Sequence, residues 1–99
     1  MLEATSVIQE DNAQVRVTRW HLPAGGHTGF HVHEMDYVIV PLNSGPLTIA
    51  AEDGSRSQAV MSAGESYCRP AGVAHNVINE GPGEIIFVEV ELKESLTTG

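Results

Sequence analysis

Three histidines stand where they could hold one metal ion. His31 and His33 are separated by one residue in a segment of β-prone residues. Because side chains alternate between the two faces of a strand, both imidazoles point to the same face. A third imidazole from a neighbouring strand would complete one face of an octahedral coordination sphere. The pair therefore predicts a transition-metal site that needs one more ligand.

His75 is the candidate for that third ligand. It follows the turn Pro70-Ala71-Gly72, in which proline fixes φ and glycine permits a backbone conformation that other residues avoid. A purely structural explanation is weak for the trio, because interior imidazoles without a partner cost desolvation free energy. His21 and His27, taken singly, are expected to be surface or hydrogen-bonded structural residues.

Short β-strands must position these residues. Helical periodicity is absent, and β-prone runs alternate with turns rich in Gly, Pro, Asn and Asp, of which Asp53-Gly54 is the best hairpin signal. We expect strands over residues 14–22, 29–33, 37–42, 47–51, 57–62, 65–69, 75–79 and 85–92. This rhythm predicts an all-β sandwich or barrel.

Two segments indicate how the barrel is packed. In 85–92, alternation places four apolar residues on one face, which we expect to be core: Ile86, Val88, Val90 and Leu92. The run 37–40 is apolar on both faces, so we expect it to be covered on one side by the barrel interior and on the other by a second sheet or a subunit partner.

Composition narrows the class of protein. Ninety-nine residues suit one domain, and the formal net charge of −8 argues against nucleic acid and anionic lipid as partners. No apolar run of about 20 residues could cross a bilayer, and the first ten residues do not resemble a signal peptide, so we expect a cytoplasmic protein. Cys68 is the only cysteine; it excludes an intramolecular disulfide, and we expect it to be buried.

Several of these residues form two motifs that resemble those of the cupin superfamily. The second motif, G-x5-P-x-G-x2-H-x3-N, is matched without departure by Gly64, Pro70, Gly72, His75 and Asn79. The first, G-x5-H-x-H followed by a glutamate, is matched by Gly25, His31 and His33. The glutamate is missing, and Tyr37 stands in its place. Asp36 is the second choice for a replacement ligand, since a shift of one residue turns a side chain to the other face.

The resemblance implies one jelly-roll-like β-barrel, the RmlC-like double-stranded β-helix, over residues 1–99 with a core at about 12–93. It implies one divalent transition-metal ion on His31, His33 and His75, with iron favoured over zinc, manganese or nickel. The stretches 16–20, 31–42 and 69–79 look like those of small single-domain cupins associated with β-alanine degradation.

Similar three-histidine cupins include iron-dependent dioxygenases, so the leading hypothesis is a metal-dependent oxygenase acting on a small, anionic carboxylate or carbonyl metabolite. Tyr37 would orient the substrate or donate a proton, and Arg69 could clamp a carboxylate or instead face solvent and pair with Glu65. Trp20 and Phe30 could line the substrate pocket or fill the core.

Two other function classes stay open at this point. One is a non-catalytic module that binds or senses a metabolite, and the other is a metal-free isomerase or epimerase with histidine and tyrosine as acid and base. A homodimer is expected because a small barrel has a strand edge to protect, and Thr5–Ile8 is the candidate for strand exchange.

Overall fold

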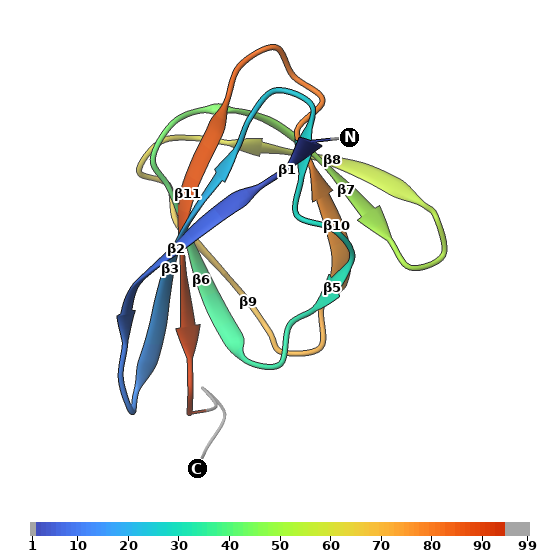
Figure 1. The fold of residues 1–99 in the computed structure, drawn as a ribbon. Coiled ribbons are helices and arrows are strands. Elements are labelled where there is room, and N and C mark those ends of the chain that lie inside the picture. Colours follow the sequence, from blue (N-terminus) through green and yellow to red (C-terminus); the bar gives the residue numbers. More distant parts are fainter. Residues whose placement is uncertain (1, 95–99) are drawn as a thin grey trace.

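The computed structural model describes residues 2–94, and in this part of the chain it contains eleven β-strands and no helix (Figure 1). None of the described residues therefore forms a helix that is long and apolar enough to span a lipid bilayer. The expected all-β fold is confirmed.

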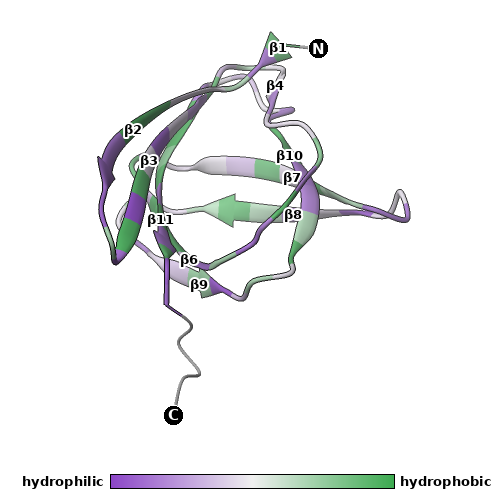
Figure 2. Cartoon of the chain, turned by 60° about the horizontal axis from the view of Figure 1, so that its bottom comes forward, coloured by the Kyte–Doolittle hydropathy of each residue, from purple (hydrophilic) through white to green (hydrophobic). Residues whose placement is uncertain are grey.

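The strands form two sheets. The first contains β1 (Leu2–Glu3), β4 (Gly26–His27), β5 (His31–Val32), β7 (Gly45–Ala51), β8 (Arg56–Met61) and β10 (Ala74–Ile78). Their order is β1-β4-β10-β7-β8, and β5 also pairs with β10. The second contains β2 (Thr5–Asp11), β3 (Val15–Leu22), β6 (Asp36–Pro41), β9 (Tyr67–Arg69) and β11 (Ile85–Leu92), in the order β2-β3-β11-β6-β9. The strands of both sheets surround one interior (Figure 2).

All eight expected strands overlap strands of the structure, while β1, β2 and β4 were not predicted. Strand β2 is an edge strand whose seven residues are all exposed, so it lacks the alternation of polarity that marks a strand in sequence. The hairpin expected at Asp53-Gly54 joins β7 to β8, and Gly54 has a φ of 85° there.

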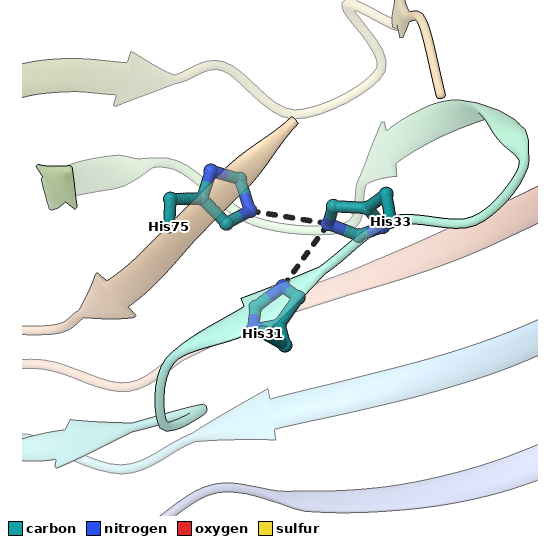
Figure 3. Close-up of side chains that lie close together, drawn as sticks. All are labelled: His31, His33 and His75. Carbon is teal, nitrogen blue, oxygen red and sulfur yellow. Dashed lines mark hydrogen bonds between the residues drawn. The ribbon is translucent and has the colours of Figure 1, made fainter. Parts of the chain in front are cut away.

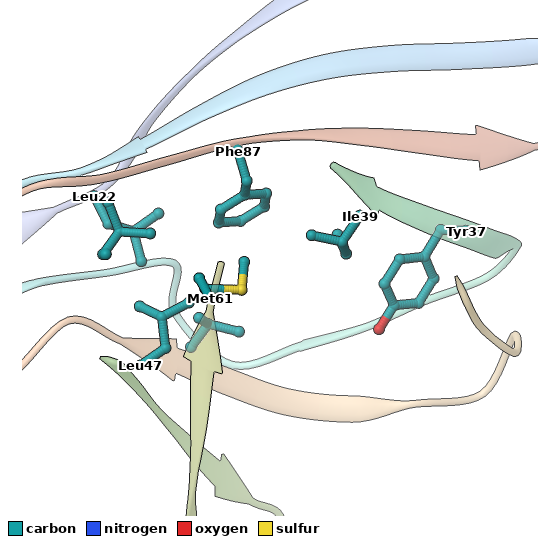
Figure 4. Packing of buried hydrophobic residues seen from close by; sticks show 8 residues of the cluster. Leu22, Tyr37, Ile39, Leu47, Met61 and Phe87 are labelled. Carbon is teal, nitrogen blue, oxygen red and sulfur yellow. The ribbon is translucent and has the colours of Figure 1, made fainter. Parts of the chain in front are cut away.

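One half of the interior is an apolar core. Its residues come from both sheets and are at most 5% exposed: Leu22, Leu47, Met61, Ile85 and Phe87 (Figure 4). Asn79 closes this half with a fully buried side chain, whose amide donates hydrogen bonds to the carbonyls of Leu22, Pro23 and Gly83. This motif asparagine therefore ties the end of β3 and the loops after β3 and before β11 to one buried side chain.

The expected core face of β11 is wrong. Ile85 and Phe87 are buried in the interior, so the alternation also turns Glu89 and Glu91 inward, where both line the internal cavity. The other face is only partly buried and carries Ile86, Val88, Val90 and Leu92. The prediction failed because it assumed that the interior is apolar along the whole strand.

Cys68 was expected to be buried, but it lies on the outer face of the second sheet. This residue pairs with Val38 on the outer side of β6 and is exposed rather than buried. Within β6, Tyr37 and Ile39 are buried in the interior, while Val38 and Val40 are only partly buried. No second sheet covers them among residues 2–94.

Candidate metal centre

Backbone pairing brings the three histidines together. Strands β5 and β10 are antiparallel with His31 directly opposite His75. Two backbone hydrogen bonds of 2.8 Å hold the turn before β10 against His33, the residue that follows β5. Gly72 N donates to the His33 carbonyl, and His33 N donates to the Val73 carbonyl. Gly72 has a φ of 98°, which glycine adopts without strain. The second motif thus sets His75 beside the His-x-His pair.

The ring nitrogens converge on one point (Figure 3). Nε2 of His33 lies 3.0 Å from Nε2 of His31 and 3.1 Å from Nε2 of His75, and the possible ligand atoms all lie within 4.8 Å of one another. His33 is buried and the other two rings are half-buried. Side chains from β10, from β5 and from the residue directly after β5 therefore offer their nitrogens to a single site.

The remaining nitrogen of His31 is held by the backbone. Its Nδ1 lies 2.8 Å from the Gly29 carbonyl, and a carbonyl oxygen can only accept, so Nδ1 carries the proton. The same carbonyl accepts a hydrogen bond from the Thr28 hydroxyl, which in turn accepts one from Val77 N. This arrangement fixes the tautomer that leaves the Nε2 lone pair free, as in metal-ligating histidines.

The three imidazoles fit a transition-metal ion. Burial, reinforced by the neighbouring histidines, lowers the pKa of His33 and of His75 to about 4, so both rings are neutral at pH 7. Two nitrogens bound at right angles to one ion at about 2.1 Å would be about 3.0 Å apart, close to the two shortest separations here. Neutral imidazoles suit zinc, iron, copper and nickel alike, so the donor set does not select the ion.

A cavity of about 650 Å³ opens from this cluster into the interior and is walled by both sheets. The ring of Tyr37 stacks on that of His33, with centroids 3.9 Å apart and planes at 20°. Burial, followed by the charge of Glu89, raises the pKa of Tyr37 to about 12. The Tyr37 hydroxyl is therefore protonated at neutral pH and can donate a hydrogen bond.

Residues 18–91 match the family model of the cupin domain, in agreement with the two motifs and with the barrel. The chain belongs to the cupin family. It is 47% identical over 91 residues to the β-alanine degradation protein BauB of Pseudomonas aeruginosa, covering 92% of this chain and 95% of that protein.

Solved structures agree with this assignment. The crystal structure of a cupin domain from Bordetella pertussis Tohama I has a TM-score of 0.90 and 46% identity, over 94% of this cupin and 96% of that chain. The polyketide cyclase RemF from Streptomyces resistomycificus has a TM-score of 0.71 and 18% identity, over 97% of this cupin and 72% of that chain. The second likeness shows a shared fold alone.

The remaining predicted site residues lie in different places. Trp20 lines the cavity, and its Nε1 is buried without a hydrogen-bond acceptor among residues 2–94. Phe30 is 52% exposed and lies outside the cavity wall. The Asp36 carboxylate accepts a hydrogen bond from Ala71 N at 2.8 Å and is not part of the three-histidine cluster.

Arg69 lies in the cavity wall but is largely exposed. Its guanidinium lies 4.5 Å from the centroid of the Tyr67 ring, and it donates a hydrogen bond to the Cys68 carbonyl. The described residues include no ion pair between Arg69 and Glu65. This cupin thus carries a cation where a ligand could reach it.

The two other histidines have partners elsewhere. Nε2 of His21 lies 2.6 Å from the Glu84 carboxylate at the surface, and Nδ1 of His27 lies 3.3 Å from the Asn76 amide. Neither belongs to the three-histidine cluster. Their placement agrees with the structural roles expected for them singly.

Sequence reasoning missed Glu89. Burial, reinforced by the Glu91 charge, raises the pKa of this cavity-lining carboxyl to about 7. A signal was present, because two glutamates alternate with valines directly after Phe87. Placing the aromatic residue inside the barrel would have turned both carboxyls inward with it.

Proposed function

We propose that this cupin binds one divalent transition-metal ion through His31, His33 and His75 and is a mononuclear, dioxygenase-like metalloenzyme for a small carboxylate or carbonyl metabolite. The observation that carries the proposal is the convergence of three Nε2 atoms, one of them in a tautomer fixed by the Gly29 carbonyl. Iron is favoured over zinc, manganese and nickel. A ferrous ion would supply Lewis acidity and the ability to activate dioxygen.

The charge of the site favours an anionic ligand. Three neutral imidazoles cancel none of the ion's positive charge, whereas a carboxylate ligand would cancel one unit. The protonated Tyr37 hydroxyl, next to His33, would donate a hydrogen bond to an oxygen of the bound metabolite. Arg69 would attract the carboxylate as it enters the cavity.

The relative at 47% identity is named for β-alanine degradation. We therefore propose that the metabolite is a small acid formed or consumed in β-alanine breakdown. The cavity of about 650 Å³ accommodates such a metabolite, because it is larger than a three-carbon acid needs.

Elemental analysis of protein purified without chelators or affinity-column metal tests the metal centre. We expect about one ion per chain in the wild type and in the control His27→Ala, and loss of the ion in His31→Ala and His75→Ala. The iron-loaded protein is then screened for oxygen uptake with small carboxylates and diketones. Metabolite binding without uptake would assign a non-catalytic binding module.

Failure to bind iron, zinc, manganese or nickel would contradict the metalloenzyme and favour the metal-free isomerase. In that case His75 and Tyr37 would act as acid and base. The same variants separate the two cases, because an isomerase would lose turnover in His75→Ala without any change in metal content.

We also propose that the protein is a homodimer. The partly buried outer face of the second sheet supports this, since it carries adjacent valines on β6 and β11: Val38, Val40, Val88 and Val90. The exposed edge strand β2, which includes the expected exchange segment Thr5–Ile8, lies at one end of that sheet. Sedimentation should give twice the chain mass of 10.6 kDa.

A further inference from the structure

The cavity wall carries a second polar group, on the sheet that does not hold the three-histidine cluster. Glu89 lies on β11 of the second sheet, paired with Thr18 of β3 and Ile39 of β6. The histidines belong to β5 and β10 of the first sheet or directly follow β5. Both groups line one cavity. A ligand in this cavity therefore meets nitrogen ligands on one wall and a carboxyl on the other.

Glu89 has no partner of its own. Within residues 2–94, no hydrogen bond or ion pair reaches its carboxyl group. The nearest candidates are engaged elsewhere, because Arg16 pairs with Asp11 and Glu91, and Arg69 lies over the Tyr67 ring. Arg19 pairs with Val88 on the outer face. An unpartnered, largely buried carboxyl is costly, which favours a partner supplied by a ligand.

Aromatic residues share the wall with this carboxyl. Trp20 and Phe87 pair directly across β3 and β11, and Phe87 precedes Glu89 by two residues on the same face. Burial is the main cause of the raised pKa of Tyr37 and of Tyr67, and the charge of Glu89 adds to it in both cases, so both rings lie within the electrostatic reach of Glu89. A carboxylate among aromatic rings is a combination that attracts an organic ammonium group.

The two walls of the cavity thus have opposite preferences. The metal centre of the proposed function takes an anion, and the opposite wall offers a carboxylate and aromatic faces to a cation. We propose that Glu89 binds the ammonium group of a short ω-amino acid whose carboxylate lies at the three-histidine centre. This inference rests on the proposed metal centre and narrows its ligand from small acids in general to those that still carry their amine.

Calorimetry on zinc-loaded protein tests this with pairs of ligands that differ only in the amine: glycine and acetate, β-alanine and propionate, and 4-aminobutyrate and butyrate. At the best chain length, we expect the amino acid to bind at least about 10-fold more tightly than its partner acid, as for one charge-assisted contact. In Glu89→Gln this advantage should disappear, while the affinity for the partner acid changes less than about 3-fold.

Two controls make the result specific. Glu91→Gln alters the neighbouring inward glutamate, which already pairs with Arg16, and should keep the preference for the amine. The zinc affinity of Glu89→Gln should equal that of the wild type, which shows that the fold and the metal centre are intact.

The outcomes separate the two proposals. An amino acid that binds no better than its partner acid overturns the role of Glu89 and leaves the metal centre standing. A preference that survives in Glu89→Gln also overturns it, because the amine then chelates the metal. Failure of the wild type to bind any of zinc, iron, manganese and nickel overturns the proposed function and this inference together. Failure of the zinc-loaded protein to bind any of the six acids overturns this inference alone.

Discussion

The barrel interior has two halves that are built from the same strands but differ in chemistry. Strand β11 shows the contrast best, because its inward residues change from Ile85 and Phe87 to Glu89 and Glu91. The apolar half, defined above by Leu22, Leu47, Met61, Ile85 and Phe87, is at most 5% exposed. The polar half contains the three histidines, Tyr37 and Glu89 around the cavity.

The difference shows where stability and chemistry are located. In the polar half, burial disfavours the charged form of the titratable side chains. It lowers the pKa of His33 and His75 and raises the pKa of Glu89. The polar half therefore lowers the stability of the metal-free protein, and the apolar half compensates. If this division is correct, each half can be damaged without damaging the other.

The largest effect should come from opening a cavity in the apolar half. Leu22 is fully buried, so Leu22→Ala should lower the free energy of unfolding by about 2–5 kcal/mol in urea denaturation. The zinc affinity of the folded variant should stay within about 3-fold of the wild type, because Leu22 belongs to the apolar cluster and not to the three-histidine cluster, and distant effects are close to additive. A loss of zinc affinity that clearly exceeds this limit of about 3-fold would show that the two halves are coupled.

Much of the fold could be predicted from sequence because it rests on local signals. Turn residues and β-prone runs located eight strands, and the motif spacing around His75 identified the family. The three histidines could be grouped before their geometry was known, since His31 and His33 share a face at a spacing of two residues. These inferences needed only strand periodicity and motif spacing.

The rest depended on which face of a strand is inside. Alternation in β11 defines two faces but does not say which one is buried, and hydrophobicity points to the wrong one when the interior is polar. Glu89 was missed for this reason, and Cys68 was expected to be buried although it lies on the outer face. Strand β2 was missed because both of its faces are exposed.

A smaller effect should be a pH dependence of stability that comes from the polar half alone. The pKa of Glu89 is raised from 4.5 to about 7 in the folded protein, so between these values the unfolded chain has lost a proton that the folded one keeps. The contribution of the Glu89 carboxyl to the free energy of unfolding is therefore fully present below pH 4.5, and it is lost as the pH rises toward 7. We expect metal-free Glu89→Gln to gain about 2–3 kcal/mol over the wild type between pH 4 and pH 8.

Urea denaturation with a chelator across this pH range measures the gain. The groups that face Glu89 are Glu91 of the same strand, Tyr37 of the adjacent strand β6, Tyr67 of β9, and the three histidines that line the same cavity. Their contributions are present in both proteins, so the difference between the two curves isolates Glu89 to first order. A difference that is independent of pH would mean that the Glu89 carboxyl is solvated and is no part of a buried polar half.

The smallest effect concerns the support behind the ligands. Thr28→Val removes the hydroxyl that donates to the Gly29 carbonyl, which holds the Nδ1 proton of His31. Zinc affinity should fall about 10-fold, as is usual when a partner behind a metal ligand is lost, while the free energy of unfolding changes by about 1 kcal/mol. Thr28→Ser retains the hydroxyl and should restore the affinity. If the valine and serine variants bind zinc equally well, the tautomer of His31 is set by the Gly29 carbonyl alone, and the polar half needs no support beyond the backbone of the segment before β5.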